Sequence, residues 1–96
     1  SDVFDSEEAF RVGLVQEVVP FGSELERAIE IAEIICEGAP LAVQATKRSS
    51  MRYVTEGEQA AIAAMGADQT LLAETEDAEE GVNAFKERRK GNFKGK

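Results

Sequence analysis

The sequence predicts an all-α fold of about five helices, with one short strand near the N-terminus. Two observations support this prediction: apolar residues recur at helical spacing through most of the chain, and helix-capping residues precede these segments. The 96 residues, 43% hydrophobic and 31% charged, have the composition of an ordinary globular domain. We expect a single domain over residues 1–96. Its core should depend on a partner or on further chain, because small domains bury only roughly 60–65% of their unfolded surface.

The N-terminal quarter combines a helical turn with the predicted strand. Asp5 or Ser6 is placed to cap a short turn over residues 7–12. Residues 14–19 (LVQEVV) are then rich in β-branched side chains, and Pro20 closes the run. We interpret this run as a short edge strand, since β-branched residues favour strands and proline is tolerated at a sheet edge.

Two helices are predicted in the middle of the chain. Ser23 and Glu26 have the spacing of a capping box, in which each side chain bonds the other residue's backbone N–H. The helix that they start should end at Gly38, and Pro40 should open the next helix, which runs to Tyr53. The apolar stripe of the first of these helices consists of Leu25, Ala28, Ile29, Ala32, Ile35 and Cys36.

Two further helices complete the prediction. Thr55 and Glu58 repeat the capping-box spacing in front of an alanine-rich segment, whose small residues indicate that another helix approaches closely. Thr75 is placed to cap the last helix, which has acidic residues near its positive end. The apolar seam of this last helix consists of Ala78, Val82 and Phe85.

The distribution of charge divides the chain unequally. Residues 1–80 carry 18 acidic and 5 basic residues, whereas residues 81–96 carry one acidic and six basic residues. An acidic body repels phosphates over most of its surface, so we expect no nucleic-acid partner. The basic C-terminal segment could hold an anionic ligand, or it could be a solvated helix end whose cations interact with the helix dipole.

Several classes of chemistry have no residues to support them. The chain has no histidine and a single cysteine, Cys36, so histidine catalysis, the usual zinc sites and an internal disulfide are excluded. The glutamates at helical spacing lie on polar faces, where carboxylates are ordinarily solvated, and we assign no catalytic or metal-binding residue. No apolar run is long enough to span a membrane, and the first residues lack the layout of a signal peptide. We therefore expect a reducing, cytoplasmic setting.

One cluster near the C-terminus could bind a nucleotide. Phe85 precedes Arg88 and Arg89 by one helical turn. An aromatic ring can stack on adenine while a neighbouring guanidinium forms paired hydrogen bonds with phosphate oxygens. From the residues alone, Phe85 is better explained as a core residue of the last helix.

Four segments, in order, resemble the C-terminal third of the enoyl-CoA hydratase/isomerase (crotonase) family. They are residues 6–20 (SEEAFRVGLVQEVVP), 39–47 (APLAVQATK), 76–89 (EDAEEGVNAFKERR) and 92–95 (NFKG). They are similar to the family patterns A-x-x-x-G-L-V-x-x-V-V-P, A-P-x-A-x-x-x-T-K and E-D-x-x-E-G-x-x-A-F-x-E-K-R. Together the four segments span nearly the whole chain.

The resemblance implies a function for a larger parent enzyme. The family acts on acyl-CoA thioesters, so the parent would hydrate or isomerise a 2-enoyl-CoA in fatty-acid metabolism, with coenzyme A carried by the substrate and no separate cofactor. The oxyanion hole and catalytic carboxylates lie in the N-terminal core, which this chain lacks, so the chain alone should be inactive. It would contribute subunit assembly, as trimers or hexamers in the parent, and part of the CoA site.

The resemblance also implies roles for individual residues and leaves two alternatives. Phe85 would contact adenine and Arg88 phosphate, with Arg89 beside them; Arg88 stands where the family has lysine, which keeps the charge and changes its geometry. One alternative is a free-standing helical interaction module. The other is a fragment of a different crotonase-family enzyme, because the residues that decide the reaction lie upstream.

Overall fold

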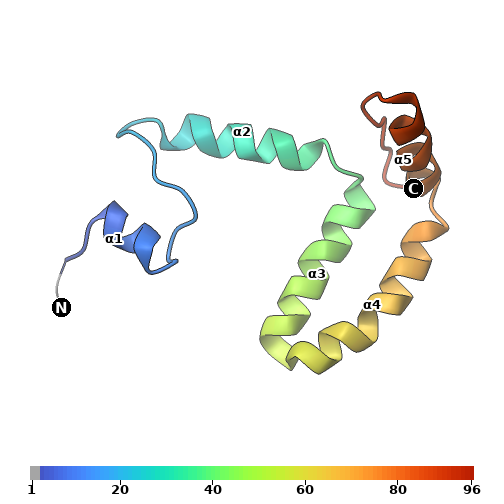
Figure 1. Ribbon diagram of the computed structural model, residues 1–96, viewed down its shortest axis with the longest axis horizontal. Coiled ribbons are helices and arrows are strands. Elements are labelled where there is room, and N and C mark those ends of the chain that lie inside the picture. Colours follow the sequence, from blue (N-terminus) through green and yellow to red (C-terminus); the bar gives the residue numbers. More distant parts are fainter. Residues whose placement is uncertain (1–2) are drawn as a thin grey trace. The chain divides into compact units, whose positions relative to one another are not determined.

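The computed structural model describes residues 3–96 and contains five helices, with no strand among the described residues. The prediction of an all-α fold is therefore confirmed. The chain divides into two compact units, one ending at Ala32 and one covering Glu33–Lys96, which we describe separately. The helices are α1 (Ser6–Arg11), α2 (Glu24–Cys36), α3 (Pro40–Glu56), α4 (Glu58–Ala73) and α5 (Glu76–Glu87) (Figure 1).

The strand predicted for residues 14–19 is wrong. The backbone N–H groups of Leu14 and Val15 both donate to the Ala9 carbonyl, at 2.9 and 3.4 Å, and so close the turn after α1. A strand is stabilised by side chains packing on its neighbours, and no second strand lies among residues 3–96 to pair with this one. The β-branched residues favour an extended conformation locally, but the described residues provide no neighbouring strand for them to pair with.

The first unit consists of α1, the following turns and most of α2. Asp5 caps α1 as predicted, accepting from the Glu8 N–H at 2.9 Å. At the start of α2 the Gly22 N–H donates to Glu24 at 3.2 Å. The predicted capping box of Ser23 with Glu26 does not form among the described residues, so this prediction is wrong.

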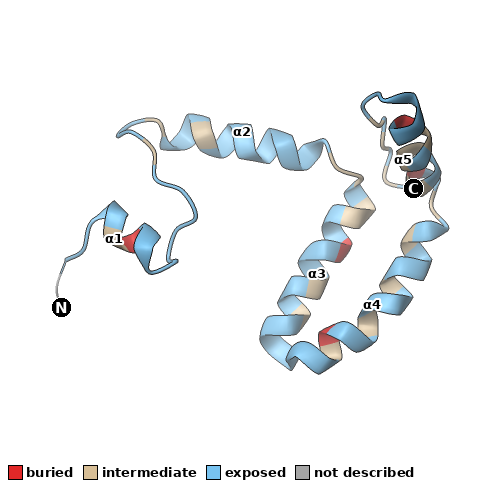
Figure 2. Cartoon of the chain, in the orientation of Figure 1, coloured by how far each residue is buried: buried red, intermediate tan, exposed pale blue. Residues whose placement is uncertain are grey.

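The second unit is built on the hairpin of α3 and α4, which lie side by side in Figure 1. Pro40 opens α3 as predicted, but the Thr55 hydroxyl donates to the Met51 carbonyl at 3.0 Å inside this helix and does not cap the next one. The break comes at Gly57, with φ 89° and ψ 171°, a conformation that is essentially restricted to glycine. Ala45 and Ala61 are buried on α3 and α4 (Figure 2), which agrees with the close helix approach predicted from the small residues.

The last helix, α5, packs against α4. Thr75 caps it as predicted, accepting from the Ala78 N–H at 3.1 Å. Asp77 and Ala84 are its buried residues (Figure 2). In the part of the chain that the structure describes, no helix is long and apolar enough to cross a membrane.

The apolar faces of the helices are mostly uncovered. Among residues 3–96, the buried apolar residues are four alanines, and no residue of α2 is buried. Ile34 and Leu25 of α2 keep 63% and 73% of their surface exposed, and Phe85 of α5 keeps 86%. The described residues thus form five helices, but no large apolar side chain is buried between them.

Candidate functional site

The predicted contact residues lie where α5 ends. Phe85 is in the last turn, and Arg88 follows the helix in the left-handed conformation, with φ 55° and ψ 40°. Arg88 is the only non-glycine with positive φ among the described residues. The conformation lets the backbone N–H of Arg88 reach the Phe85 carbonyl at 3.2 Å and that of Arg89 reach the Ala84 carbonyl at 3.0 Å. Glycine normally holds this position, so an arginine here is a local outlier.

The three predicted residues differ in what their side chains contact. Phe85 is exposed, and within residues 3–96 the Arg88 guanidinium forms no ion pair or hydrogen bond. Arg89, in contrast, binds both Glu80 oxygens, at 2.5 and 3.0 Å, and Glu87 at 2.6 Å. Two of the three side chains are therefore available to a ligand, whereas Arg89 is held by carboxylates.

The pairing of Arg89 with Glu80 changes the acidity of both groups. The Arg89 hydrogen bond, helped by the Asn92 N–H at 2.7 Å, lowers the pKa of Glu80 from 4.5 to about 2. The two carboxylates raise the pKa of Arg89 above its usual value. Both groups therefore stay charged at neutral pH, and the pair ties the end of α5 to its first half.

A second carboxylate holds the chain that follows α5. Asp77, only 4% exposed, accepts from the backbone N–H of Lys94 and of Gly95, both at 2.7 Å, and its own N–H donates to the Lys96 carbonyl at 3.1 Å. We call the set formed by Asp77 and Glu80 with residues 89–96 the tail clasp. Through it, the chain turns back at Arg88 and runs along α5 towards the start of that helix (Figure 1).

Packing supports the tail clasp. Phe93 is half-buried, and its ring lies over α5, so that a Cβ placed on Gly81 would meet it at 3.8 Å. A Cβ on Gly91 would overlap the same ring, which explains a glycine there.

Lys90 pairs with Glu37, ahead of α3. A polar hollow of about 360 Å³ lies beside the clasp and is lined by Glu76, Asp77, Glu80, Arg89, Asn92 and Lys94.

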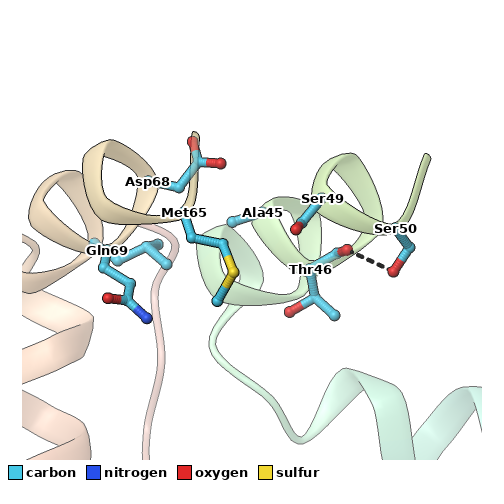
Figure 3. Close-up of a pocket in the computed structure, with 8 residues that line it drawn as sticks. Ala45, Thr46, Ser49, Ser50, Met65, Asp68 and Gln69 are labelled. Carbon is cyan, nitrogen blue, oxygen red and sulfur yellow. Dashed lines mark hydrogen bonds between the residues drawn. The ribbon is translucent and has the colours of Figure 1, made fainter. Parts of the chain in front are cut away.

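A second hollow, of about 240 Å³, lies between α3 and α4 (Figure 3). The Thr46 and Ser50 hydroxyls on its α3 side donate to carbonyls of their own helix, those of Ala42 at 2.9 Å and of Thr46 at 3.0 Å. Met65 enters from α4. These two hydroxyls are satisfied locally, and neither forms a hydrogen bond with Asp68, the carboxylate that lines the same hollow, so neither is activated as a nucleophile.

Sequence reasoning missed the tail clasp. It gave Asp77 only a favourable interaction with the positive end of the helix dipole, and no neighbouring residue in the sequence indicated that this side chain is buried. The available signal was the pair Asp77 and Glu80, one turn apart, followed by Gly91 and Gly95 in the tail. Among residues 3–96, no group of three or more histidine, cysteine, aspartate or glutamate side chains is arranged to hold a metal ion.

Comparison with known protein families gives a match over the whole chain. The family described as "Enoyl-CoA hydratase/isomerase" matches residues 1–96. Among curated proteins, the chain is 37% identical over 91 residues to the 2,3-dehydroadipyl-CoA hydratase of Escherichia coli (strain K12), covering 95% of this chain and 36% of the relative. It is 40% identical over 88 residues to enoyl-CoA hydratase EchA19 of Mycobacterium tuberculosis, covering 90% of this chain and 32% of that protein.

Solved structures agree with these sequence matches. A probable enoyl-CoA hydratase/isomerase from Mycobacterium abscessus superposes with a TM-score of 0.94 at 44% identity, covering 99% of this chain and 37% of that one. An enoyl-CoA hydratase from Geobacillus kaustophilus gives 0.88 at 36% identity, with 99% and 36% covered. The chain thus spans only about a third of the length of the proteins that it matches.

Proposed function

Because this chain belongs to the enoyl-CoA hydratase/isomerase family, we propose that it is the C-terminal helical region of an enzyme that adds water to the double bond of a 2-enoyl-CoA. The match over residues 1–96 is the observation that carries this proposal. Hydration is preferred to isomerisation because the curated relatives described above are named hydratases. A cytoplasmic setting and a place in fatty-acid metabolism are part of the proposal.

In this proposal the chain contributes one wall of the CoA site. The exposed Phe85 ring would stack on adenine, and the unpaired Arg88 guanidinium would bind phosphate. Arg89 lies beside them with its charge shared between Glu80 and Glu87, so it would act by keeping this surface in place. We assign no catalytic residue to the chain and expect it to have no hydratase activity by itself.

A calorimetric titration of the chain with CoA tests this contact. We expect Arg88→Glu to weaken binding by about tenfold or more, since a charged hydrogen bond to phosphate is lost. Lys47→Glu is the matched control, because it makes the same charge reversal at an exposed site on α3. Added salt, or CoA without its 3′-phosphate, should weaken binding to the unmodified chain.

Two results would count against the proposed contact. If Arg88→Glu and Lys47→Glu have equal effects, the binding reflects net charge and does not involve the end of α5. If the chain binds CoA equally well with and without the 3′-phosphate and at every salt concentration, phosphate recognition by Arg88 is refuted.

We also propose that the chain associates with copies of itself through its uncovered helix faces. The isoleucines of α2 are exposed, and contiguous apolar surface of this kind ordinarily marks an interface. Sedimentation velocity should show concentration-dependent oligomers, and Ile34→Glu on α2 should shift them towards monomer. Observation of monomer alone at high concentration would contradict this part of the proposal.

A further inference from the structure

Asp77 is the buried charged side chain among the described residues, at 4% exposure. Burying a carboxylate is costly unless its oxygens are hydrogen-bonded, and here each oxygen accepts from a different backbone N–H, Oδ1 from Lys94 and Oδ2 from Gly95. Both bonds are short, at 2.7 Å, as expected for a charged acceptor. The partners lie 17 and 18 residues away along the chain, so Asp77 fixes a long-range contact and is not simply a helix cap.

Glu80 acts on the same segment one helical turn later. Its carboxylate accepts from the Asn92 N–H at 2.7 Å and binds the Arg89 guanidinium. Asp77 and Glu80 therefore bind two different parts of the segment that follows α5. This segment can reach them only if the chain reverses direction immediately after the helix.

The reversal takes place at Arg88, the residue with φ 55°. A non-glycine residue in the left-handed region is unfavourable, and it persists only where surrounding contacts hold it. If the segment after it were released, Arg88 could return to an ordinary conformation. The direction in which its side chain leaves the backbone, three residues after the exposed Phe85, would then change.

We propose that Asp77 is a positioning residue for CoA recognition: by binding the backbone of Lys94 and Gly95, it holds Arg88 in the conformation that presents its guanidinium to the nucleotide. Asp77 does not touch the ligand. This inference rests on the proposed function and adds to it the residue that pre-organises the contact. The apparent affinity for CoA is proportional to the fraction of molecules in which the segment is docked, so it decreases when that fraction decreases.

The test uses the full-length enzyme and two thioester substrates with the same enoyl group, one on CoA and one on pantetheine, which lacks the nucleotide. Asp77→Asn keeps the side-chain shape, but it replaces one acceptor oxygen by an NH₂ group that faces a backbone N–H. We expect KM for the CoA thioester to rise about tenfold, as for a segment docked in a tenth of the molecules, with kcat nearly constant. KM for the pantetheine thioester should not change.

Asp68→Asn is the matched control, because Asp68 is a half-buried carboxylate of the same unit that pairs with Arg52 on α3 at 3.5 Å. It should leave the ratio of the two KM values unchanged. A merely structural role of Asp77 would change both substrates alike, and that result would overturn the inference. So would an unchanged KM for the CoA thioester.

Arg88→Glu distinguishes failure of this inference from failure of the proposed function. If Arg88→Glu raises KM for the CoA thioester alone and Asp77→Asn does not, the nucleotide contact stands and the positioning role is refuted. If neither variant separates the two substrates, the end of α5 is not in the nucleotide site, and both the inference and the proposed contact are refuted.

Discussion

The ion pair of Glu80 with Arg89 gives the most direct test of the geometry after α5. The Arg89 hydrogen bond is the largest cause of the lowered pKa of Glu80, and the Asn92 N–H is the second. Arg89→Gln should therefore raise the pKa of Glu80 from about 2 towards 4.5, but leave it below 4.5, because the Asn92 N–H still donates. The measurement is an NMR titration of the Glu80 side-chain carboxyl carbon between strongly acidic and neutral pH.

The two pKa values define a pH window in which the effect is large. At pH 3, a carboxyl with a pKa of about 2 is roughly nine-tenths ionised, whereas one near 4.5 is only about 3% ionised. Since the folded-state pKa lies below the usual value, Glu80 contributes its stabilisation of the tail clasp above about pH 4.5. That contribution is lost as the pH falls through the window and is absent below about pH 2.

Arg88→Gln is the control for this titration, because it removes the same charge one residue away, from a guanidinium that has no partner among residues 3–96. It should leave the pKa of Glu80 nearly unchanged. If Arg88→Gln and Arg89→Gln shift this pKa equally, general electrostatics and not a specific pair lowers it. In that case Arg89 does not lie beside Glu80, and the reversal of the chain at Arg88, which brings the two together, is refuted as well.

Two further predictions concern glycines. Gly91→Ala should destabilise the second unit by about 1–3 kcal/mol because its Cβ would overlap the Phe93 ring, whereas Gly66→Ala in open space on α4 should stabilise it by about 0.5–1 kcal/mol. Urea titration followed by circular dichroism would show this, and an unchanged or increased stability of Gly91→Ala would contradict the packing of Phe93. Gly57→Ala should cost about 1–3 kcal/mol in the same assay through strain at φ 89°, and D-alanine introduced there by chemical ligation should recover most of it; equal stability of the two forms would contradict the strain argument.

Local sequence signals predicted the helices well and their ends less well. Asp5, Pro40 and Thr75 act at helix starts as predicted, because each needs only the next few backbone N–H groups, or none in the case of proline. Thr55 has the same residue type and spacing, yet α3 continues past it to Glu56. The backbone of Gly57 decides this boundary, since a residue in its conformation cannot continue a helix.

The tail clasp could not be predicted in the same way. Its contacts join Asp77 to residues 17 and 18 positions further along, and no periodic pattern encodes a reversal at an arginine. Phe85 and Arg88 were found from their residue types together with the family resemblance. Whether Arg89 is free or paired depends on Glu80, nine residues earlier, which becomes its neighbour only after the chain turns back.

The apolar periodicity that predicted α2 indicates that one face of this helix is apolar, yet the described chain has no core of large side chains. Periodicity reports that one face of a helix will be covered, and it does not say by what. Ile29 and Ile35 lie on the predicted stripe, yet they keep 50% and 52% of their surface exposed, and the only apolar residues buried across the described helices are alanines. Short-range hydrogen bonds, caps and the tail clasp therefore define these helices, and their apolar faces lack the burial that ordinarily supplies most of a helix's stability.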